Sequence, residues 1–97
     1  MAKGYWIGHI DVHDDETYKK YVEADTPVVA AYGGKFLVRG GEIGVSEEAP
    51  RSRNVVIEFE SFEQAMACYQ SPEYQAAKKF RDAASTGGVM VIKGHDG

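Results

Sequence analysis

The sequence predicts an α+β fold in which two helical regions lie on one face of an antiparallel sheet. Apolar residues alternate with a period of two in four segments, residues 4–12, 35–39, 55–59 and 89–93. Apolar residues recur at helical spacing between the first and second of these segments, and again between the third and fourth. The order is therefore β-α-β-β-α-β, which is the ferredoxin-like pattern.

The first helix is predicted to follow a turn at residues 13–16, where acidic side chains suit the helix dipole. Its apolar stripe contains one acid, Asp25, and Pro27 falls inside the pattern. We therefore expect a kink at Pro27, or a break with Thr26 as the cap of a second segment. Gly33-Gly34 ends the helix, because the residue after a helix commonly needs a positive φ. The stripe consists of Tyr18, Tyr21, Val22, Asp25, Val29 and Tyr32.

The third strand runs directly into two consecutive helices. Ser61 has a glutamine three positions further on, which is the spacing of a capping box. Ser71-Pro72 starts the next helix, since Ser caps well and Pro fits the first helical position. That helix is predicted to turn either Phe80 or Arg81 toward the core. Residues 85–88, which include two glycines, are predicted to end it before the last strand.

Length and charge limit the classes of function. With 97 residues the chain has room for one domain, residues 1–97. The net charge is −4 with no basic block, which argues against nucleic acid and against an anionic membrane surface as partners. No apolar run has the length of a signal peptide or of a membrane span, and Cys68 is the only cysteine. We expect a cytoplasmic protein without internal disulfides.

The sheet face away from the helices is predicted to be apolar and in need of a cover. A face of that kind does not stay in water, and two such sheets packed face to face would cover each other. We therefore predict a homodimer. The predicted face shows Ile7, Leu37 and Val56, with Met90 and Ile92 if the last strand takes that register, beside His9, Arg39 and Glu58.

Two stretches, EFESFEQAMACYQSPEYQAAKKFR and AAYGGKFLVRGG, resemble the family numbered 1330 among the domains of unknown function. The resemblance extends over residues 4–93. Members often have a Trp before the Tyr of the second helical region, where this chain has Cys68. The resemblance implies two subunits that form a dimeric α+β barrel, and it implies no particular reaction. Its most specific parts are Gly33-Gly34, residues 37–41, Glu58-Phe59, and residues 69–74 together with Arg81.

Glu58 and His9 are the candidate catalytic residues. Both are predicted to face the side that dimerisation would enclose, where a carboxylate can have its pKa raised toward a value useful for proton transfer. A neutral imidazole at His9 can shuttle protons or orient a ligand. The competing interpretations are a structural ion pair between Glu58 and Arg39, and a histidine that is only hydrogen-bonded within the barrel.

Arg39, Arg81, Tyr69 and Tyr74 are the candidate substrate-binding residues. A guanidinium group matches the geometry of a carboxylate, so either arginine can anchor an anionic ligand. Arg81 can equally pair on the helix surface. The hydroxyl groups of Tyr69 and Tyr74 can reach a pocket, and the competing interpretation is that both rings are core aromatics with a wet tip.

Metal and nucleotide sites have no support in the sequence. His9 and His13 lie on a strand and a turn, which does not bring them together as a helix would. The glycine pairs lack the spacing of a phosphate-binding loop. Cys68 has no base beside it in the sequence and is expected to be a small buried hydrophobe.

The resemblance implies membership of a superfamily that includes cofactor-free monooxygenases, isomerases and decarboxylases of small molecules, haem enzymes and stress-response proteins. A fold shared with enzymes is an analogy and does not by itself imply catalysis. We expect a binder or enzyme for a small, anionic organic molecule, working in the barrel cavity without metal or cofactor. In a catalytic version Glu58 or His9 moves a proton and Arg39 holds the anion. The alternative is a non-catalytic structural or stress-related homodimer. A third hypothesis is haem binding, with His9 as axial ligand.

Overall fold

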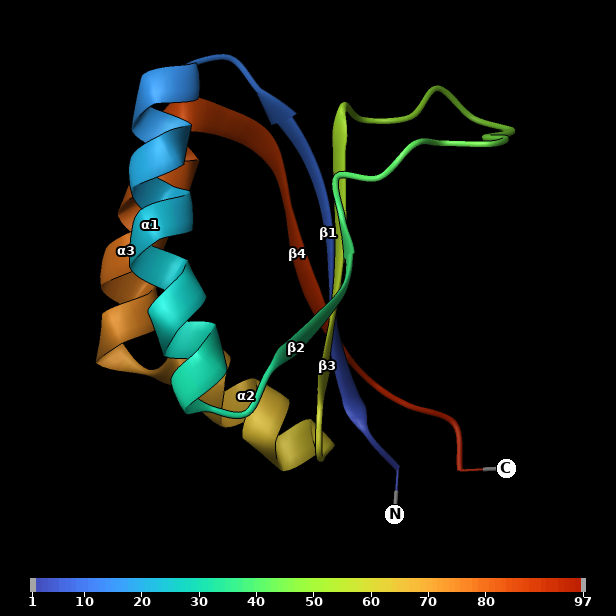
Figure 1. Cartoon of the computed structure of the whole chain (residues 1–97), viewed down its shortest axis with the longest axis vertical. Coiled ribbons are helices and arrows are strands. Elements are labelled where there is room, and N and C mark those ends of the chain that lie inside the picture. The colour runs from blue at the N-terminus through green and yellow to red at the C-terminus, as the bar shows by residue number, and fades with distance from the viewer. Residues whose placement is uncertain (1, 97) are drawn as a thin grey trace.

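Four strands and three helices in the described residues form two layers, with the helices on one side of the sheet (Figure 1). The computed structural model describes residues 2–96, so Met1 and Gly97, the ends of the expected domain, lie outside the described residues. The order of elements confirms the ferredoxin-like pattern, with the second helical region divided at Ser71. The strands are β1 (Gly4–Val12), β2 (Lys35–Arg39), β3 (Arg53–Phe59) and β4 (Ser85–Lys93); the helices are α1 (Asp15–Ala31), α2 (Phe62–Gln70) and α3 (Pro72–Ala84).

The sheet has the strand order β2-β3-β1-β4, and every neighbouring pair is antiparallel. Trp6 in β1 lies between Ile57 of β3 and Val91 of β4. Directly opposite residues share a face of the sheet. This register therefore collects large apolar side chains from three strands under the helices.

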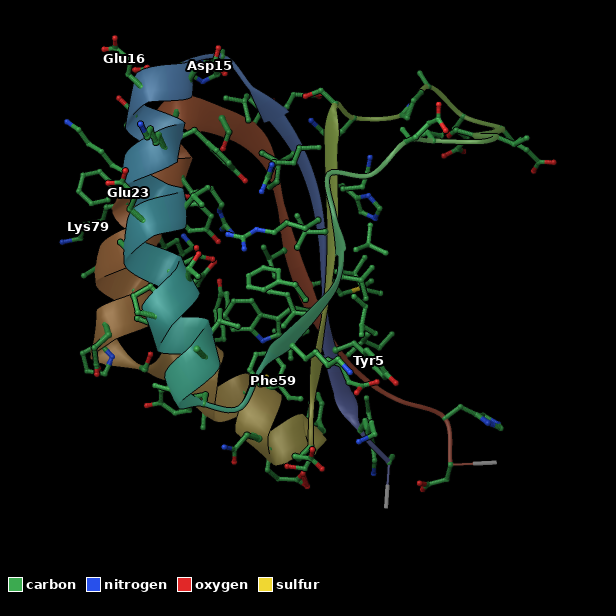
Figure 2. The ribbon with its side chains drawn as sticks, viewed as in Figure 1. Tyr5, Asp15, Glu16, Glu23, Phe59 and Lys79 are labelled. Atoms are coloured by element: carbon green, nitrogen blue, oxygen red, sulfur yellow. The ribbon has the colours of Figure 1, made fainter. Side chains whose placement is uncertain are left out.

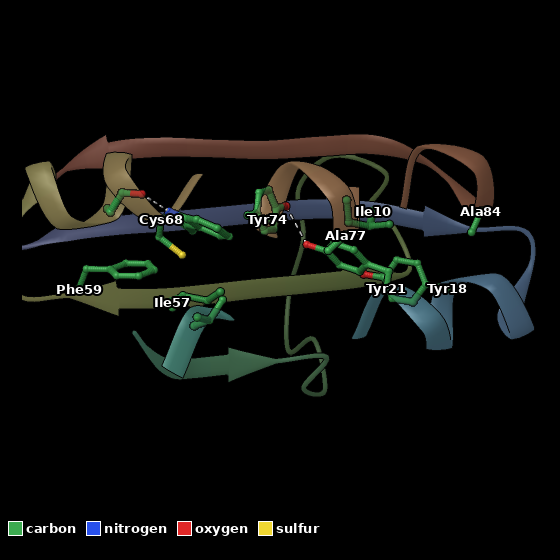
Figure 3. Close-up of a cluster of buried hydrophobic side chains, with 12 residues drawn as sticks. Ile10, Tyr18, Tyr21, Ile57, Phe59, Cys68, Tyr74, Ala77 and Ala84 are labelled. Carbon is green, nitrogen blue, oxygen red and sulfur yellow. Dashed lines mark hydrogen bonds between the residues drawn. The ribbon is translucent and has the colours of Figure 1, made fainter. Parts of the chain in front are cut away.

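The core lies between the sheet and the helices (Figure 3). Trp6 and Phe59 are at most 2% exposed, and their rings lie 5.4 Å apart between centroids. In α3, Arg81 is buried and Phe80 is exposed, which decides between the two alternatives in the sequence. Cys68 is fully buried, as expected, and burial raises the pKa of its thiol to about 12.

Helix α1 continues through Pro27 without the predicted break. Thr26 does not cap a second segment, because its hydroxyl donates a hydrogen bond to the carbonyl of Val22 at 2.7 Å within the same helix. Proline removes one backbone hydrogen bond from a helix. Here the buried residues on both sides of it, Asp25 and Val29, hold the two halves against the same core. Of the two predicted alternatives, the break with a second segment capped by Thr26 is therefore wrong.

Serine caps begin α2 and α3 as predicted. Ser61 accepts a hydrogen bond from the backbone N–H of Gln64 at 3.0 Å, and Ser71 accepts one from that of Tyr74 at 3.2 Å. Only half of the capping box forms, because the side chain of Gln64 donates to the carbonyl of Tyr32 instead. That bond connects the beginning of α2 to the end of α1. None of the helices in residues 2–96 is long and apolar enough to span a bilayer.

Strand β4 begins at Ser85 and not at Val89, so the predicted stop at residues 85–88 is already part of the strand. These residues pair with β1 from Val12 to His9. Gly87 has a φ of 97°, and a Cβ there would collide with the carbonyl oxygen of His9. Glycine thus permits the strand to continue where its sequence resembles a loop.

The other face of the sheet is free of helices in Figure 1, and residues 40–52 extend from the same side. Tyr5 and Phe59 lie on opposite sides of the sheet in Figure 2. Four large apolar side chains on this open face, from β2 and β4, are 42–49% exposed. They are Leu37, Val38, Met90 and Ile92.

Replacement of Gly87 by alanine should destabilise the protein by about 2 kcal/mol or more, because the new Cβ strains a positive φ and meets the carbonyl of His9. Gly88→Ala is the matched control, since a Cβ at Gly88 meets no atom within 4 Å. The control should change stability by about 0.5 kcal/mol or less. Urea unfolding of both variants measures the difference, and equal losses would contradict the assignment.

Candidate functional site

A cavity of ≈ 30 Å³ lies between the helices and the sheet, inside a hollow of ≈ 430 Å³ that includes its open mouth. Gly8 of β1 forms part of its wall, between the large side chains of Trp6 and Ile10. A Cβ at Gly8 would meet the side chains of Val55 and Val89 at 3.7 Å, which is ordinary contact. The absence of a side chain at Gly8 therefore leaves room between the layers.

Asp25 of α1 lines this cavity and is 5% exposed. Burial raises the pKa of its carboxyl group from the ordinary 3.8 to about 6. The positive charges of Arg39 and Arg53 and the nearby hydroxyl groups of Tyr21 and Thr26 oppose that rise in the pKa. Desolvation thus outweighs the attraction of the nearby cations. A carboxyl group that titrates near neutral pH can both accept and donate a proton.

Three arginines from three elements line the same cavity: Arg39 of β2, Arg53 of β3 and Arg81 of α3. Arg39 is exposed, donates to the hydroxyl of Thr26 at 2.8 Å, and lies over the ring of Phe36 at 4.1 Å. Arg81 is 5% exposed. With Asp25 ionised, three guanidinium groups and one carboxylate leave an excess of two positive charges in the cavity wall.

Arg53 has a hydrogen-bond donor that no group within residues 2–96 satisfies. Its Nε is buried and has no hydrogen-bond partner, and its guanidinium group lies 5.4 Å from the centroid of the Tyr18 ring. Buried polar groups in proteins are nearly always paired, so an unpaired one needs an explanation. A ligand with an acceptor atom in the cavity would satisfy it.

Two tyrosines and an arginine form a buried polar cluster beside the cavity. The hydroxyl oxygens of Tyr21 and Tyr74 lie 2.8 Å apart (Figure 3). Arg81 donates from Nη1 to the Tyr74 hydroxyl at 3.0 Å. Burial raises the pKa of Tyr74 to about 12 and that of Tyr21 well above its ordinary value. Both phenols therefore stay neutral at physiological pH.

The structure places Arg39 on the helix side of the sheet, which corrects the predicted open-face position. A bulge between Phe36 and Val38 shifts the register, so that Val38 pairs with Val56 and Arg39 pairs with Val55. An extra residue in one strand reverses the faces of all side chains that follow it. The alternative ion pair between Arg39 and Glu58 is wrong, because the bulge puts the two side chains on opposite faces of the sheet.

Glu58 and His9 both lie on the open side of the sheet, as predicted, but apart from each other. Glu58 accepts a hydrogen bond from the Tyr5 hydroxyl at 3.3 Å and lies 4.0 Å from Lys3 Nζ. His9 is exposed, and its Nδ1 lies 2.9 Å from Asn54 Oδ1. Glu58 pairs with Tyr5, four residues before His9, which separates the two by about 13 Å along the strand. They do not form one site within a single chain.

The other predicted binding residues lie on the helix side. Arg81 lines the cavity, whereas Tyr74 is fully buried behind it and reaches it through Tyr21 and Arg81. Tyr69 packs against the rings of Trp6 and Tyr74, with centroids 5.9 and 5.4 Å away. No cluster of three or more His, Cys, Asp or Glu side chains suited to a metal occurs in residues 2–96.

Asp25 and Arg53 are the site residues that sequence reasoning did not select. Asp25 was visible as the one acid in an apolar helical stripe, and a charged residue there is seldom buried without a partner. That signal could have identified it. Arg53 follows a polar stretch at the beginning of its strand, and the sequence around it gives no sign that its side chain turns inward.

The fold and the buried charged cavity define an α+β protein with one candidate site between its layers. The chain belongs to the DUF1330 family, a domain of unknown function, whose profile matches residues 3–95. No curated protein matches the chain.

Solved structures resemble the fold at low sequence identity. A protein of unknown function from Rhodopseudomonas palustris has a TM-score of 0.70 at 20% identity, covering 95% of this chain and 80% of that one. SnoaB, a cofactor-independent oxygenase from Streptomyces nogalater, has a TM-score of 0.69 at 9% sequence identity. That match covers 100% of this chain and 97% of SnoaB. A protein of unknown function from Jannaschia sp. CCS1, described as dimeric and ferredoxin-like, has a TM-score of 0.65 at 14% sequence identity. That match covers 96% of this chain and 98% of the Jannaschia protein. These likenesses confirm the fold class.

Asp25→Asn should stabilise the protein at neutral and alkaline pH. Because the folded-state pKa is raised to about 6, Asp25 contributes most to stability below about pH 4, and that contribution is lost as the pH rises through 6. The difference from the ordinary pKa of 3.8 corresponds to about 3 kcal/mol at 1.36 kcal/mol per pKa unit. Chemical unfolding from about pH 3.5 to 8 measures the gain.

Glu23→Gln is the matched control for that measurement, since Glu23 is exposed on the outer surface of α1, two residues away (Figure 2). The control should follow the pH dependence of the wild-type protein. A constant difference in unfolding free energy between wild type and Asp25→Asn at all pH values would show that Asp25 does not titrate as described.

Proposed function

We propose that the protein binds a small organic anion in the cavity between its helices and its sheet, and exchanges a proton with it through Asp25. The observation that carries this proposal is a buried carboxyl group that lines the same cavity as three guanidinium groups. The proposal locates the chemistry on the helix side of the sheet, whereas the catalytic roles expected for Glu58 and His9 on the open face stay predictions.

The charge of the cavity wall supports an anionic ligand. The excess of two positive charges, with Asp25 ionised, favours a carboxylate or an enolate over a neutral or cationic molecule. The unpaired Nε of Arg53 supplies a buried donor for one of its oxygens. The rings of Phe36, Tyr18 and Trp6 provide apolar walls for the rest of the molecule.

The chemistry that this arrangement supports is acid–base chemistry. With its pKa near 6, Asp25 is mainly ionised at neutral pH and can remove a proton from a carbon or oxygen beside a carbonyl group. Guanidinium groups near that carbonyl would stabilise the negative charge that develops on its oxygen. When Asp25 returns the proton to another atom of the ligand, the net reaction is an isomerisation.

The similarity to SnoaB concerns the fold alone. Because SnoaB is a cofactor-independent oxygenase, the same architecture can support chemistry without a cofactor, and this agrees with the expectation for this chain. A cofactor-free mechanism and a cytoplasmic location stay predictions.

The alternative function is a non-catalytic structural or stress-related homodimer. One observation favours it: Arg39 and Arg81 already donate hydrogen bonds to Thr26 and Tyr74 within the chain. In that case hydroxyl groups of the chain itself satisfy Arg39 and Arg81, and no ligand is required.

A thermal-shift titration with benzoate tests the proposed anion site. Benzoate at one hundred times its Kd should stabilise the protein by about 2.7 kcal/mol, and neutral benzamide should not. Arg53→Gln should weaken benzoate binding about tenfold or more, because it removes a cation and the unpaired donor. Asp25→Asn should bind benzoate more tightly than the wild type, since it removes a repelling charge.

Arg51→Gln is the matched control, because Arg51 pairs with Asp11 at 2.8 Å at the surface and lies outside the cavity. It should bind benzoate like the wild type. If neither benzoate nor aliphatic carboxylates stabilise the protein, the structural alternative replaces the proposal.

We further propose that the open face of the sheet pairs with a second copy of this chain. The exposed residues Leu37, Val38, Met90 and Ile92 form an apolar surface there that a second sheet would cover. Residues 40–52, which extend from the same side, would lie beside that partner (Figure 1). The description of the Jannaschia protein as dimeric supports this arrangement. Glu58 and His9 would then be enclosed, and their catalytic role stays a prediction.

Met90→Glu should convert the dimer to a monomer, or weaken dimerisation about tenfold or more, because it puts a charge into an apolar interface. Phe80→Glu is the control, since Phe80 is similarly exposed, at 39%, but lies on α3. Light scattering at micromolar concentration gives the masses. A wild-type protein with the mass of a single chain would contradict the dimer.

A further inference from the structure

Two of the three arginines that line the cavity have no carboxylate partner. None of the ion pairs in the described part of the chain includes Arg39 or Arg53. Arg81 differs, because its Nη2 lies 3.8 Å from a carboxylate oxygen of Asp82. Asp25 attracts both Arg39 and Arg53 from a greater distance, but it supplies a single negative charge. The cavity wall therefore holds two guanidinium groups that an anionic ligand can pair.

The two guanidinium groups lie at different depths. Among the cavity-lining residues of the described chain Arg39 alone is exposed, so it marks the mouth. Its Nη2 donates to the Thr26 hydroxyl of α1 at 2.8 Å, which leaves the other N–H groups of a five-donor guanidinium for a ligand. Arg53 is partly buried, and its Nε is a buried donor without a partner in residues 2–96. One arginine is therefore at the entrance, and the other reaches inside.

The sheet register places the two side chains within reach of one small molecule. Arg39 pairs with Val55, and Arg53 precedes Val55 by two residues in β3. Both arginines therefore project on the helix side, and diagonal neighbours of this kind have Cβ atoms about 7 Å apart. A guanidinium group pairs best with a carboxylate, through two parallel hydrogen bonds. A short chain with a carboxylate at each end matches this spacing.

The shape of the cavity separates the two ends of such a molecule. The enclosed part measures ≈ 30 Å³, close to the volume of one water molecule in the liquid, about 30 Å³. It accepts a small head group and not a whole molecule. The surrounding hollow of ≈ 430 Å³, which includes the mouth, accommodates the connecting chain and the second head group.

We propose that the ligand of the cavity is a short aliphatic dicarboxylate, with one carboxylate inside at Arg53 and the other at the mouth at Arg39. Its two negative charges balance the excess of two positive charges that remains in the cavity wall when Asp25 is ionised. This inference rests on the proposed function and narrows its ligand from any organic anion to a dianion. Arg39 is then the residue that distinguishes a dicarboxylate from a monocarboxylate.

Calorimetric titration compares succinate and glutarate with their monomethyl esters, which keep the chain and lose one charge. Measurement at about pH 7.5 keeps every free carboxyl group ionised, and a constant ionic strength keeps charge screening equal. The wild-type protein should bind at least one of the two dicarboxylates about tenfold more tightly than its own monoester, because a second charge-assisted pair forms.

Replacement of each arginine separates the two ends of the ligand. Arg39→Gln should lower the affinity of the dicarboxylate to that of the monoester and change the monoester affinity by no more than about twofold. Arg53→Gln should weaken both ligands about tenfold, since both place a carboxylate inside. Lys35→Gln is the matched control: it removes a cation from the same strand as Arg39, but Lys35 pairs with Glu58 on the open face. It should leave all affinities unchanged.

Equal binding of each dicarboxylate and its monoester would overturn the ligand class, and so would an equal loss of both ligands in Arg39→Gln. In either case the proposed anion site stands, because the monoester or benzoate still occupies it. If benzoate, the dicarboxylates and the monoesters all fail to bind, the proposed function itself is refuted and the ligand class falls with it. Binding of a monocarboxylate thus separates the two failures.

Discussion

The indole ring of Trp6 sets the separation between the sheet and the helices. Its Nε1 donates to the carbonyl of Ala65 in α2 at 2.9 Å, and its ring meets Tyr74 of α3 with centroids 4.7 Å apart. A fully buried indole cannot be compressed, so the two layers stay apart by the thickness of this ring. The next residue on the same face of β1 is Gly8, which has no side chain to fill the gap. A cavity between the layers follows from that sequence of large and small residues.

Charged groups in such a cavity are costly to a small protein. Asp25 and Arg81 are each 5% exposed, and transfer of an ionised group out of water destabilises the folded state unless partners compensate. The compensation is incomplete, since burial still dominates the pKa of Asp25 and Arg53 retains an unpaired nitrogen. Sites with uncompensated charges are where binding and catalysis are most often found, because a ligand can complete them.

The two faces of the sheet have different chemistry. The helix side carries the aromatic core and the charged cavity, whereas the open side presents exposed aliphatic residues beside His9 and Glu58. Dimerisation through the open face would leave the cavity on the opposite side of each sheet. Ligand binding and subunit pairing can therefore be tested by separate variants.

Local sequence by itself determined the order of elements, the helix caps and the face of each regular element that is buried. Ser61 and Ser71 cap their helices, and Trp6 and Ile10 turn inward, because these features depend on neighbours a few residues away. The acid in the stripe of α1 was equally visible, although its partners were not.

Only the tertiary structure decided which charged residues meet. A one-residue bulge in β2 turned Arg39 to the helix side, and alternation along the strand cannot reveal a bulge. Asp25, Arg53 and Arg81 are brought together from α1, β3 and α3 by the packing of the helices on the sheet. Contacts between residues so distant in sequence leave no local pattern, and for that reason the site had to be found in the folded chain.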